Sequence, residues 1–194
     1  NLYDNTLIVF TSDHGEEHLE HGRGGHGQQL FEECVRVPLV VHFPGAEGGG
    51  KRITARASLL DMVPTILAVV GADAPPGLDG VDLSPLLSGA GGVQWEQRPF
   101  FLDLDLLRHD GKLHRAEGVI RGHWKYILVH EPEPKALLFN PASDPEERKN
   151  RNAAEPEIAR TMRGLLHEKR VKDAAGVHLL LASDRRSPEP TTVR

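Results

Sequence analysis

The sequence predicts an α/β fold in two parts, followed by a tail. Residues 1–92 combine short, continuously apolar runs with an amphipathic helical pattern, which is typical of part of an α/β domain. Residues 93–170 alternate strand-like runs with turn residues and close on a second helical pattern, which indicates a small antiparallel β-sheet subdomain with a C-terminal helix. Residues 171–194 are predicted to be a disordered tail, because the end of the chain is polar and contains proline.

Two apolar runs in the first part are predicted to be strands. Residues 6–10 are rich in β-branched and aromatic side chains, so we expect a strand that is buried on both faces, as in a parallel sheet. Residues 37–43 form the second strand. The polar residues 11–15 follow the first strand directly, at the end where open α/β sheets place their ligands. Residues 16–29 are rich in glycine and histidine and are predicted to be a loop.

A helix is predicted over residues 58–70, where the apolar positions cover a wide face. Ser58 or Asp61 could cap the beginning of this helix, and Gly71 is predicted to end it. Residues 89–92, with three glycines, are expected to form a hinge between the two parts.

The second part is predicted to be an antiparallel meander that ends in a helix. Its strand-like runs are short and closely spaced: residues 99–102, 115–121, 123–130 and 136–139. Glycine residues such as Gly111 and Gly122 separate them. Residues 156–169 carry apolar side chains at helical spacing and are predicted to be the closing amphipathic helix.

Composition excludes several classes of protein. The chain has 194 residues, 39% of them hydrophobic, and a net charge of −5, which gives no support for a nucleic-acid binder. Its one cysteine excludes an internal disulfide framework, and no apolar run is long enough for a membrane-spanning segment. Because the chain begins at Asn1 without an initiator methionine, we expect it to be a piece of a longer protein.

Histidine and acidic residues gather just after the first predicted strand. They interleave within a short stretch: Asp13, His14, Glu16, Glu17, His18, Glu20, His21 and His26. Adjacent Asp13 and His14 can reach one divalent cation if the backbone turns sharply, and Gly15 permits such a turn. Carboxylate ligands suit Ca²⁺, Mg²⁺ or Mn²⁺, whereas further histidine ligands suit Zn²⁺. The alternative is a solvated, charged loop without a metal.

The other members of this stretch have simpler interpretations. His18 and His21 have helical spacing, so a short surface helix explains them without a function. His26 lies among glycines, where its imidazolium could bind a sulfate or phosphate oxygen or protonate a leaving oxygen; a flexible surface histidine is the alternative. Cys34 is expected to be a buried structural cysteine rather than a nucleophile, because nothing nearby in the sequence lowers the pKa of its thiol.

Five ordered blocks of the sequence resemble the sulfatase family of the alkaline phosphatase superfamily. The blocks are residues 10–41 (FTSDHGEE, EHG, GHG and RVPLVV), 58–67 (SLLDMVPTIL), 80–87 (GVDLSPLL), 119–127 (VIRGHWKYI) and 138–147 (LFNP and DPEE). The resemblance covers residues 1–170 and corresponds to the C-terminal portion of such a protein. It implies the C-terminal part of an alkaline-phosphatase-like mixed sheet, followed by the small antiparallel subdomain.

The resemblance also implies a role for three residues. Asp13 and His14 match the family's metal-binding pair, with Ca²⁺ as the first expectation and Mg²⁺, Mn²⁺ or Zn²⁺ as alternatives. His26 matches the catalytic and substrate-binding residue that contacts the sulfate and the leaving oxygen. A divalent cation and a cationic side chain would stabilise the negative charge that develops when a sulfate ester is cleaved.

The departures from the family pattern are as informative as the matches. Sulfatases use a formylglycine made from a cysteine in a Cys-x-Pro-x-Arg motif, and this chain has no such motif, because Cys34 is followed by Arg36 and Pro38 in the opposite order. The family's earlier metal ligands are also missing, so the formylglycine and those ligands are expected upstream. We therefore expect a C-terminal fragment of a metal-dependent sulfatase that is inactive alone. Without upstream partners, the first strand would expose an edge and apolar surface.

Other functional interpretations of the same residues stay open. A phosphonate or phosphodiester hydrolase, or a phosphoethanolamine transferase, would share these motifs, and a truncated homologue could be non-catalytic. The substrate of a sulfatase would be a sulfate ester, such as a sulfated sugar or an aryl sulfate. Residues 103–117 and 130–136 are expected to be variable loops that contact the group beyond the sulfate. Related enzymes are often exported to the periplasm or the cell exterior, whereas the composition fits any compartment.

Overall fold

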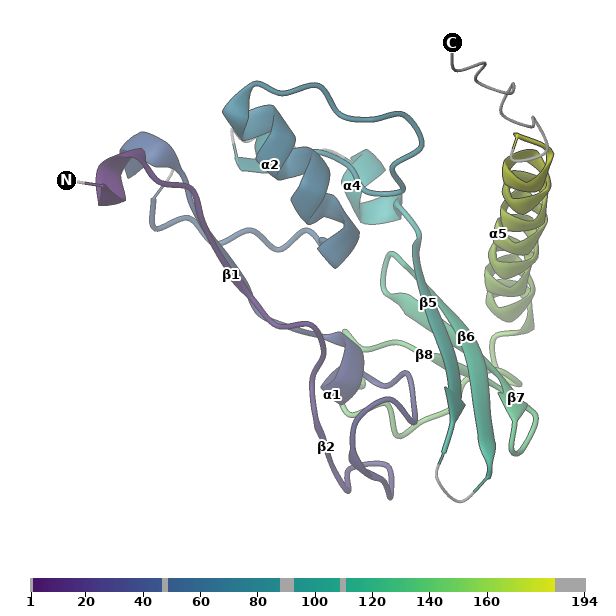
Figure 1. Ribbon diagram of the computed structural model, residues 1–194. Helices are drawn as coiled ribbons and strands as arrows, with labels where there is room; N and C mark the ends of the chain where they lie inside the picture. The colour runs from purple at the N-terminus through teal and green to yellow at the C-terminus, as the bar shows by residue number, and fades with distance from the viewer. Residues whose placement is uncertain (1, 47–48, 88–92, 109–110, 184–194) are drawn as a thin grey trace, which may run out of the picture.

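The structure is a computed structural model that describes residues 2–46, 49–87, 93–108 and 111–183. Within these residues it contains three small antiparallel sheets, several short helices and one long C-terminal helix (Figure 1). This mixture of helix and sheet is the predicted α/β class. The hinge predicted at residues 89–92 lies outside the described residues.

The first two strands form a small exposed sheet. Strand β1 (Ile8–Thr11) pairs antiparallel with β4 (Leu39–His42), and short 3-10 turns, η1 (Tyr3–Asn5) and η2 (Pro44–Ala46), flank the pair. The prediction that the first strand is buried on both faces is wrong for this chain, because the side chain of β1 residue Phe10 is 63% exposed. Among the described residues β1 pairs with one strand, so its other edge is unpaired, and its four residues are exposed or half-buried.

The predicted helix and its caps are confirmed. A 3-10 turn, η3 (Leu59–Asp61), leads into α2 (Met62–Val70). The Ser58 side chain accepts a hydrogen bond from the Leu60 N–H at 3.2 Å, and Asp61 Oδ2 accepts one from the Ser58 N–H at 2.7 Å, which satisfies amides that would otherwise lack partners. Gly71 ends the helix in the left-handed conformation with φ 70°.

Buried Asp61 also connects the first part to the second. Its carboxylate accepts two hydrogen bonds from the guanidinium of Arg98, at 2.7 and 2.9 Å, and a third from the Val81 N–H at 2.9 Å. Such a paired, bidentate geometry is the strong form of a carboxylate–guanidinium contact. Two short helices lie along this connection: α3 (Ser84–Leu87) and α4 (Val93–Gln97).

The second part is the predicted antiparallel meander. Its strands are β5 (Phe100–Leu107), β6 (Leu113–Arg121), β7 (Trp124–Glu131) and β8 (Lys135–Phe139), in the order β5-β6-β7-β8. Strand β5 extends to Leu107 and β6 begins at Leu113, so the expectation of a variable loop is wrong for most of residues 103–117. The sequence around Leu104 alternates leucine with aspartate, which is the period-2 pattern of a half-buried strand.

The four-stranded sheet is covered on both faces. On one face Ala116, Ile127 and Phe139 pack against Leu30 and Phe31, which lie beside α1 (Glu32–Val35). The opposite face packs against α5 (Pro156–Ser183), and the buried residues of that layer are Val119, Tyr126, Leu138, Met162 and Leu166. The sheet therefore lies between the loop that follows β1 and the closing helix.

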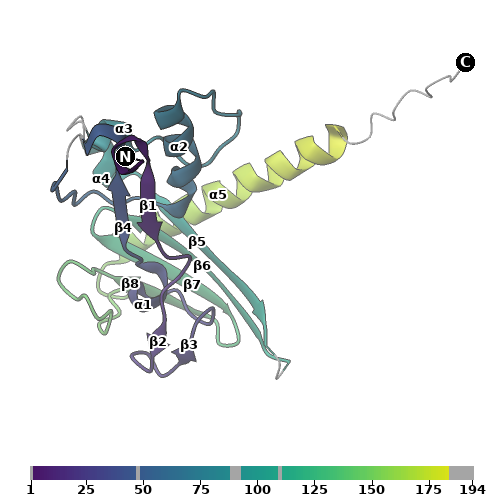
Figure 2. The ribbon, with the colours of Figure 1, turned by 60° about the vertical axis from the view of Figure 1, so that its left-hand side comes forward.

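Helix α5 is longer than predicted, so part of the predicted disordered tail is helical. It continues to Ser183, so residues 171–183 are helical rather than disordered; residues 184–194 lie outside the described residues. Residues 171–183 contain no proline and are rich in alanine and leucine, which favour helix. Figure 2 shows the C-terminal half of α5 projecting away from the rest of the molecule. Within the described residues, no helix has the length and apolar character needed to cross a membrane.

Candidate functional site

The stretch rich in histidine forms a small hairpin after β1. Strand β2 (Glu17–His18) pairs antiparallel with β3 (Gly24–Gly25), and Glu17 lies opposite Gly25. Glu16 and His26 lie immediately beyond this pair, at the open end of the ladder. The prediction of an irregular loop over residues 16–29 is thus partly wrong, since a short ladder inside it sets which side chains meet.

Three side chains on this hairpin converge. The Nδ1 atom of His26 lies 3.1 Å from Glu16 Oε2, and the rings of His14 and His26 are stacked with their centroids 4.1 Å apart. One potential ligand atom from each of His14, Glu16 and His26 lies within 4.8 Å of the other two, and all three residues are exposed. The structure therefore brings together two histidines that the sequence analysis assigned to different roles, and it adds Glu16, which that analysis did not single out.

Asp13, the other predicted site residue, lies beside this group and outside it. Its Oδ1 accepts a hydrogen bond from the His14 N–H at 3.0 Å, and its side chain is 85% exposed. The His14 N–H is the largest cause that lowers the pKa of the Asp13 carboxyl, followed by the residue's own backbone N–H and the charge of the His14 ring. The carboxylate therefore stays ionised to lower pH than usual. Its Oδ2 lies 3.6 Å from His14 Nε2.

The hairpin is held against α1 by close backbone contacts. The Gly15 N–H donates a hydrogen bond to the Cys34 carbonyl at 2.8 Å. A Cβ atom at Gly15 would lie 1.9 Å from the Glu33 carbonyl oxygen, so a residue with a side chain fits there only if the backbone moves. Gly15 was predicted from the sequence to permit a sharp turn. In the structure, the lack of a side chain at Gly15 lets the backbone lie this close to α1.

Buried Glu17 anchors the inner side of the hairpin. Its carboxylate accepts hydrogen bonds from the Cys34 thiol at 3.1 Å and from the Gln29 amide at 3.3 Å. Burial, and then the hydrogen bond and charge of Glu17, raise the pKa of the Cys34 thiol to about 12. Because only a thiolate is an effective nucleophile, the thiol is unreactive near neutral pH, which agrees with its predicted structural role.

The two remaining histidines of the stretch do not lie on a helix, which contradicts the surface-helix interpretation. His18 lies exposed on β2. His21 is mostly buried: its ring stacks on Phe31 at a centroid distance of 3.7 Å, its Nδ1 lies 2.6 Å from Glu33 Oε1, and its Nε2 lies 3.4 Å from the Glu147 carbonyl. His21 therefore links the hairpin to α1 and to the turn before α5.

A buried ion cluster fixes the same region to the four-stranded sheet. The Lys125 side chain on β7 is fully buried, with its Nζ 3.2 Å from Glu32 Oε1 and 3.1 Å from Glu147 Oε1. Glu147 Oε2 also accepts a hydrogen bond from the Glu32 N–H at 2.7 Å. Burial raises the pKa of the Glu147 carboxyl against the opposing effect of Lys125. This cluster was not predicted from the sequence, where its one signal is a lysine within the mainly apolar run of residues 124–129.

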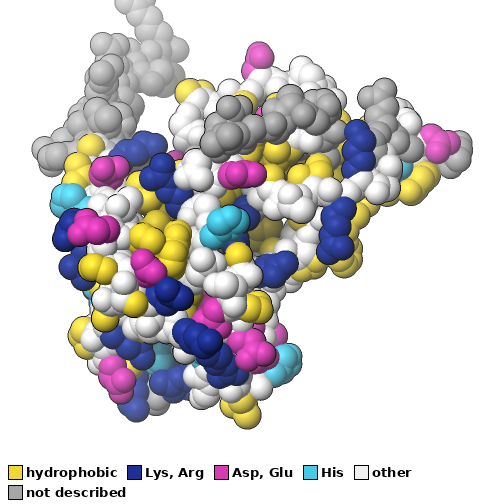
Figure 3. Space-filling view, turned by 180° about the vertical axis from the view of Figure 1, so that it is seen from behind, with side chains coloured by type: hydrophobic (Ala, Val, Ile, Leu, Met, Phe, Trp, Pro, Cys, Tyr) yellow, Lys and Arg dark blue, Asp and Glu magenta, His cyan; other side chains and the backbone are white. Residues whose placement is uncertain are grey.

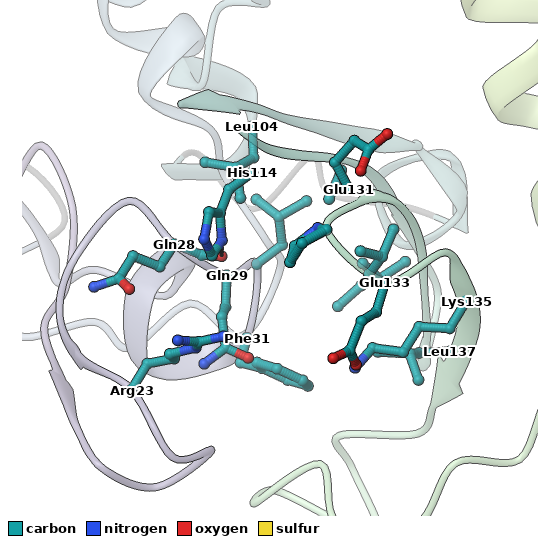
Figure 4. A pocket seen from close by; sticks show the side chains of 15 residues that line it. Arg23, Gln28, Gln29, Phe31, Leu104, His114, Glu131, Glu133, Lys135 and Leu137 are labelled. Atoms are coloured by element: carbon teal, nitrogen blue, oxygen red, sulfur yellow. Dashed lines mark hydrogen bonds between the residues drawn. The ribbon is translucent and has the colours of Figure 1, made fainter. Parts of the chain in front are cut away.

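A pocket of about 80 Å³ opens between the hairpin region and the sheet (Figure 4). Its floor is apolar and includes Phe31 and Leu137, whereas polar side chains such as Gln28, His114 and Glu133 surround it. Gln28 lies two residues beyond His26 in the chain, so the loop that carries His26 also forms one wall of the pocket. The loop predicted over residues 130–136 is shorter in the structure, because β7 continues to Glu131 and β8 begins at Lys135; this turn contributes to the opposite wall of the pocket.

Known proteins that are similar to this chain in sequence are sulfatases. A family model described as Sulfatase matches residues 1–72. Arylsulfatase K of Mus musculus is 32% identical over 163 residues, which cover 81% of this chain and 29% of that protein. An N-acetylglucosamine-6-O-sulfatase of Bacteroides thetaiotaomicron is 29% identical over 150 residues, covering 76% of this chain and 26% of that protein. The chain thus spans less than a third of the length of these relatives.

Solved structures agree with these relatives. An enzyme solved in complex with its substrate, D-glucosamine-2-N,6-O-disulfate, superimposes with a TM-score of 0.75 and 27% identity, covering 86% of this chain and 34% of that chain. A phosphonate monoester hydrolase of Agrobacterium radiobacter superimposes with a TM-score of 0.70 and 26% identity, covering 87% of this chain and 36% of that chain. The fold is therefore that of alkaline-phosphatase-like enzymes, and the chain belongs to the sulfatase family.

Proposed function

We propose that this chain forms one side of the ester-binding site of a metal-dependent sulfatase, which is a sulfuric ester hydrolase. In this proposal Asp13 and His14 hold a divalent cation, with Ca²⁺ as the first candidate, and His26 binds the sulfate and acts at the leaving oxygen. The observation that carries the proposal is the stacked contact between His14 and His26, with ring centroids 4.1 Å apart. It supports a single site because a metal ligand and an anion-binding group must both lie beside the sulfate.

The donor atoms of Asp13 and His14 fit a cation. His14 Nδ1 lies 2.8 Å from the Gly15 carbonyl oxygen, so the Nδ1–H donates there and leaves the Nε2 lone pair free for a metal. That Nε2 atom lies 3.6 Å from Asp13 Oδ2, a separation that small rotations bring to the spacing of neighbouring ligands around one ion. A bound divalent cation supplies charge stabilisation for the nonbridging sulfate oxygens.

His26 has the exposure and the backbone needed for contact with a substrate. Its side chain is 56% exposed, and its neighbours Gly25 and Gly27 adopt positive φ angles of 93° and 71°. An imidazolium here can donate a proton from a ring nitrogen to the leaving oxygen, while the paired Glu16 carboxylate orients the ring through Nδ1. The formylglycine nucleophile would come from outside this chain.

For the group beyond the sulfate, we propose a sugar. The pocket that Gln28 lines, two residues after His26 in the chain, combines an apolar floor with amide, imidazole and carboxylate groups around it, which suits the apolar faces and hydroxyl groups of a carbohydrate. Two of the relatives point the same way, since one is an N-acetylglucosamine-6-O-sulfatase and another was solved with a sulfated glucosamine.

A second candidate is phosphonate monoester hydrolysis, which the likeness to the Agrobacterium radiobacter enzyme favours. The same cation and imidazolium would serve phosphorus chemistry, because a phosphonate ester develops negative charge on the same kinds of oxygen. Turnover of the two ester classes by one preparation separates these candidates.

The deciding experiment measures hydrolysis of an aryl sulfate and an aryl phosphonate by this chain alone and by the longer reading frame that contains it. We expect no turnover by the chain alone, and faster sulfate than phosphonate turnover by the longer protein. The His26→Ala change should lower kcat/KM of the longer protein at least about 100-fold, whereas His18→Ala on the neighbouring strand should leave it unchanged. Sulfate hydrolysis by the isolated chain, or full activity of His26→Ala, would contradict the proposal.

A further inference from the structure

We propose that His14, Glu16 and His26 form a binding site for a d-block divalent cation, represented by Zn²⁺, with a ligand set that does not include Asp13. The site shares both histidines with the proposed sulfatase site, so its occupation would exclude productive binding there. This consequence rests on the proposed function, but the binding of the metal does not.

Side-chain contacts bring the three residues together at the end of the hairpin ladder. Glu17 pairs with Gly25, and just beyond this pair His26 Nδ1 lies 3.1 Å from Glu16 Oε2. The ring of His14 stacks on that of His26, with the centroids 4.1 Å apart. Glu17 itself is buried and anchors the hairpin from its inner side.

The distances match those of ligands around one small cation. Bonds of 2.0–2.1 Å in tetrahedral geometry put neighbouring ligand atoms about 3.3 Å apart. His26 Nδ1 and Glu16 Oε2 are separated by 3.1 Å, and the three potential ligand atoms all lie within 4.8 Å of one another. Side-chain rotation can shorten the longer of these separations to the ideal spacing, because all three side chains are about half exposed and free to move. A water molecule can complete the coordination from the solvent side.

The type of donor selects the metal. Two imidazoles and one carboxylate suit Zn²⁺, Cu²⁺ and Ni²⁺, whereas Ca²⁺ requires six to eight oxygen ligands. The Gly15 carbonyl fixes the ring of His14 through Nδ1, which is the supporting contact that a ligating histidine usually has. Asp13 is held instead by the His14 N–H at 3.0 Å and the Ser12 hydroxyl at 3.4 Å, outside the group of three.

The test is a calorimetric titration of the whole 194-residue chain with Zn²⁺, and a parallel titration with Co²⁺ followed by its visible absorption. We expect one ion per chain and a Co²⁺ spectrum typical of nitrogen and oxygen ligands in a four-coordinate site. Each of His14→Ala, Glu16→Gln and His26→Ala should weaken Zn²⁺ binding at least about tenfold, since even indirect partners of a metal ligand typically contribute that much.

Two controls separate this site from its alternatives. His18→Ala removes an exposed histidine from the same hairpin, and Asp13→Ala removes one of the two ligands of the proposed Ca²⁺ site; both should leave Zn²⁺ affinity within about threefold. Equal losses in either control, displacement of Zn²⁺ by an equal concentration of Ca²⁺, or no binding at all would overturn the proposal. Far-UV circular dichroism of each variant excludes unfolding as the cause.

The same variants keep this inference apart from the proposed function. If the longer protein hydrolyses no sulfate ester but the chain binds Zn²⁺ through the three residues, the proposed function fails and the metal site stands. If Zn²⁺ binding is absent while His26→Ala abolishes sulfate hydrolysis, the opposite holds. In an active protein, Zn²⁺ should inhibit hydrolysis, and Glu16→Gln should reduce the inhibition.

Discussion

Lys125 joins the two parts of the chain through a buried ion cluster. Its ammonium group is fully buried and lies between the carboxylates of Glu32 and Glu147, which belong to α1 and to the turn before α5. Removing one member of a buried ion cluster leaves uncompensated charge, which costs more than the cluster itself contributes.

We expect Lys125→Met to lower the free energy of unfolding by about 3–5 kcal/mol. The variant in which Glu32→Gln and Glu147→Gln accompany it should recover most of that loss, because no net buried charge is left. Urea unfolding followed by circular dichroism measures both. The exposed Lys172→Met is the matched control and should change stability by less than about 0.5 kcal/mol. A loss in the triple variant as large as in the single one would assign the effect to packing instead.

Cys34 leads to a second prediction for a single residue: the free energy of unfolding falls as the pH becomes alkaline. Its pKa rises from an ordinary value of 9.0 to about 12 on folding. The unfolded thiol ionises first, so the stabilisation is complete below pH 9 and is lost as the pH rises toward 12. The free energy of unfolding of the wild type should therefore fall faster between pH 9 and 11 than that of Cys34→Ala. Parallel pH profiles of the two proteins would show that the thiol does not contribute.

At the scale of the element, a close backbone contact with α1 positions the hairpin after β1, in addition to the side-chain contacts of Glu17 and His21. The contact between Gly15 and α1 leaves no room for a Cβ atom, whereas Gly24 on β3 has its nearest such neighbour, Leu19 Cδ2, at 3.8 Å. The two glycines thus differ in what surrounds them, although both lie on the same hairpin.

We expect Gly15→Ala to destabilise the chain by about 1–3 kcal/mol and to weaken Zn²⁺ binding, because the hairpin must move away from α1. Gly24→Ala should be neutral or slightly stabilising and should keep the Zn²⁺ affinity. Thermal unfolding and calorimetry on both variants provide the comparison. Unchanged metal binding in Gly15→Ala would mean that the position of the hairpin does not govern the site.

At the scale of the whole molecule, several large apolar side chains of the first part are exposed to solvent. Phe10 and Val40 lie directly opposite each other on β1 and β4, and they are 63% and 61% exposed. Residues of α2 such as Val63 and Val70 are also exposed, and the view from behind shows hydrophobic side chains open on the surface (Figure 3). An uncovered strand edge beside apolar surface favours association.

We therefore expect the chain by itself to self-associate as its concentration rises. Sedimentation velocity should show this, and the double change Phe10→Thr with Val40→Thr should shift the distribution toward monomer while the strands persist. Leu107→Thr, which replaces a 70% exposed leucine at the end of β5, should have little effect. A wild-type chain that remains monomeric at high concentration would contradict the prediction.

The helix ends and the order of strands in the second part follow from the local sequence. The cap at Ser58, the stop at Gly71 and the meander of the second part depend on neighbours a few residues apart, and their periodicity and capping patterns are legible without a structure. His14 and His26 were likewise identified as site residues from the sequence, although their roles as metal and anion ligands remain predictions.

Which distant groups meet depends on how the elements pack. Glu16 meets the two histidines where the ends of the hairpin come together, and Lys125 meets Glu32, 93 positions earlier in the chain, because α1 packs on the sheet. The exposure of β1 is equally a property of the whole, since an apolar strand looks the same in sequence whether or not neighbours cover it. Burial and long-range contact depend on how elements pack, and local propensity carries no record of that packing.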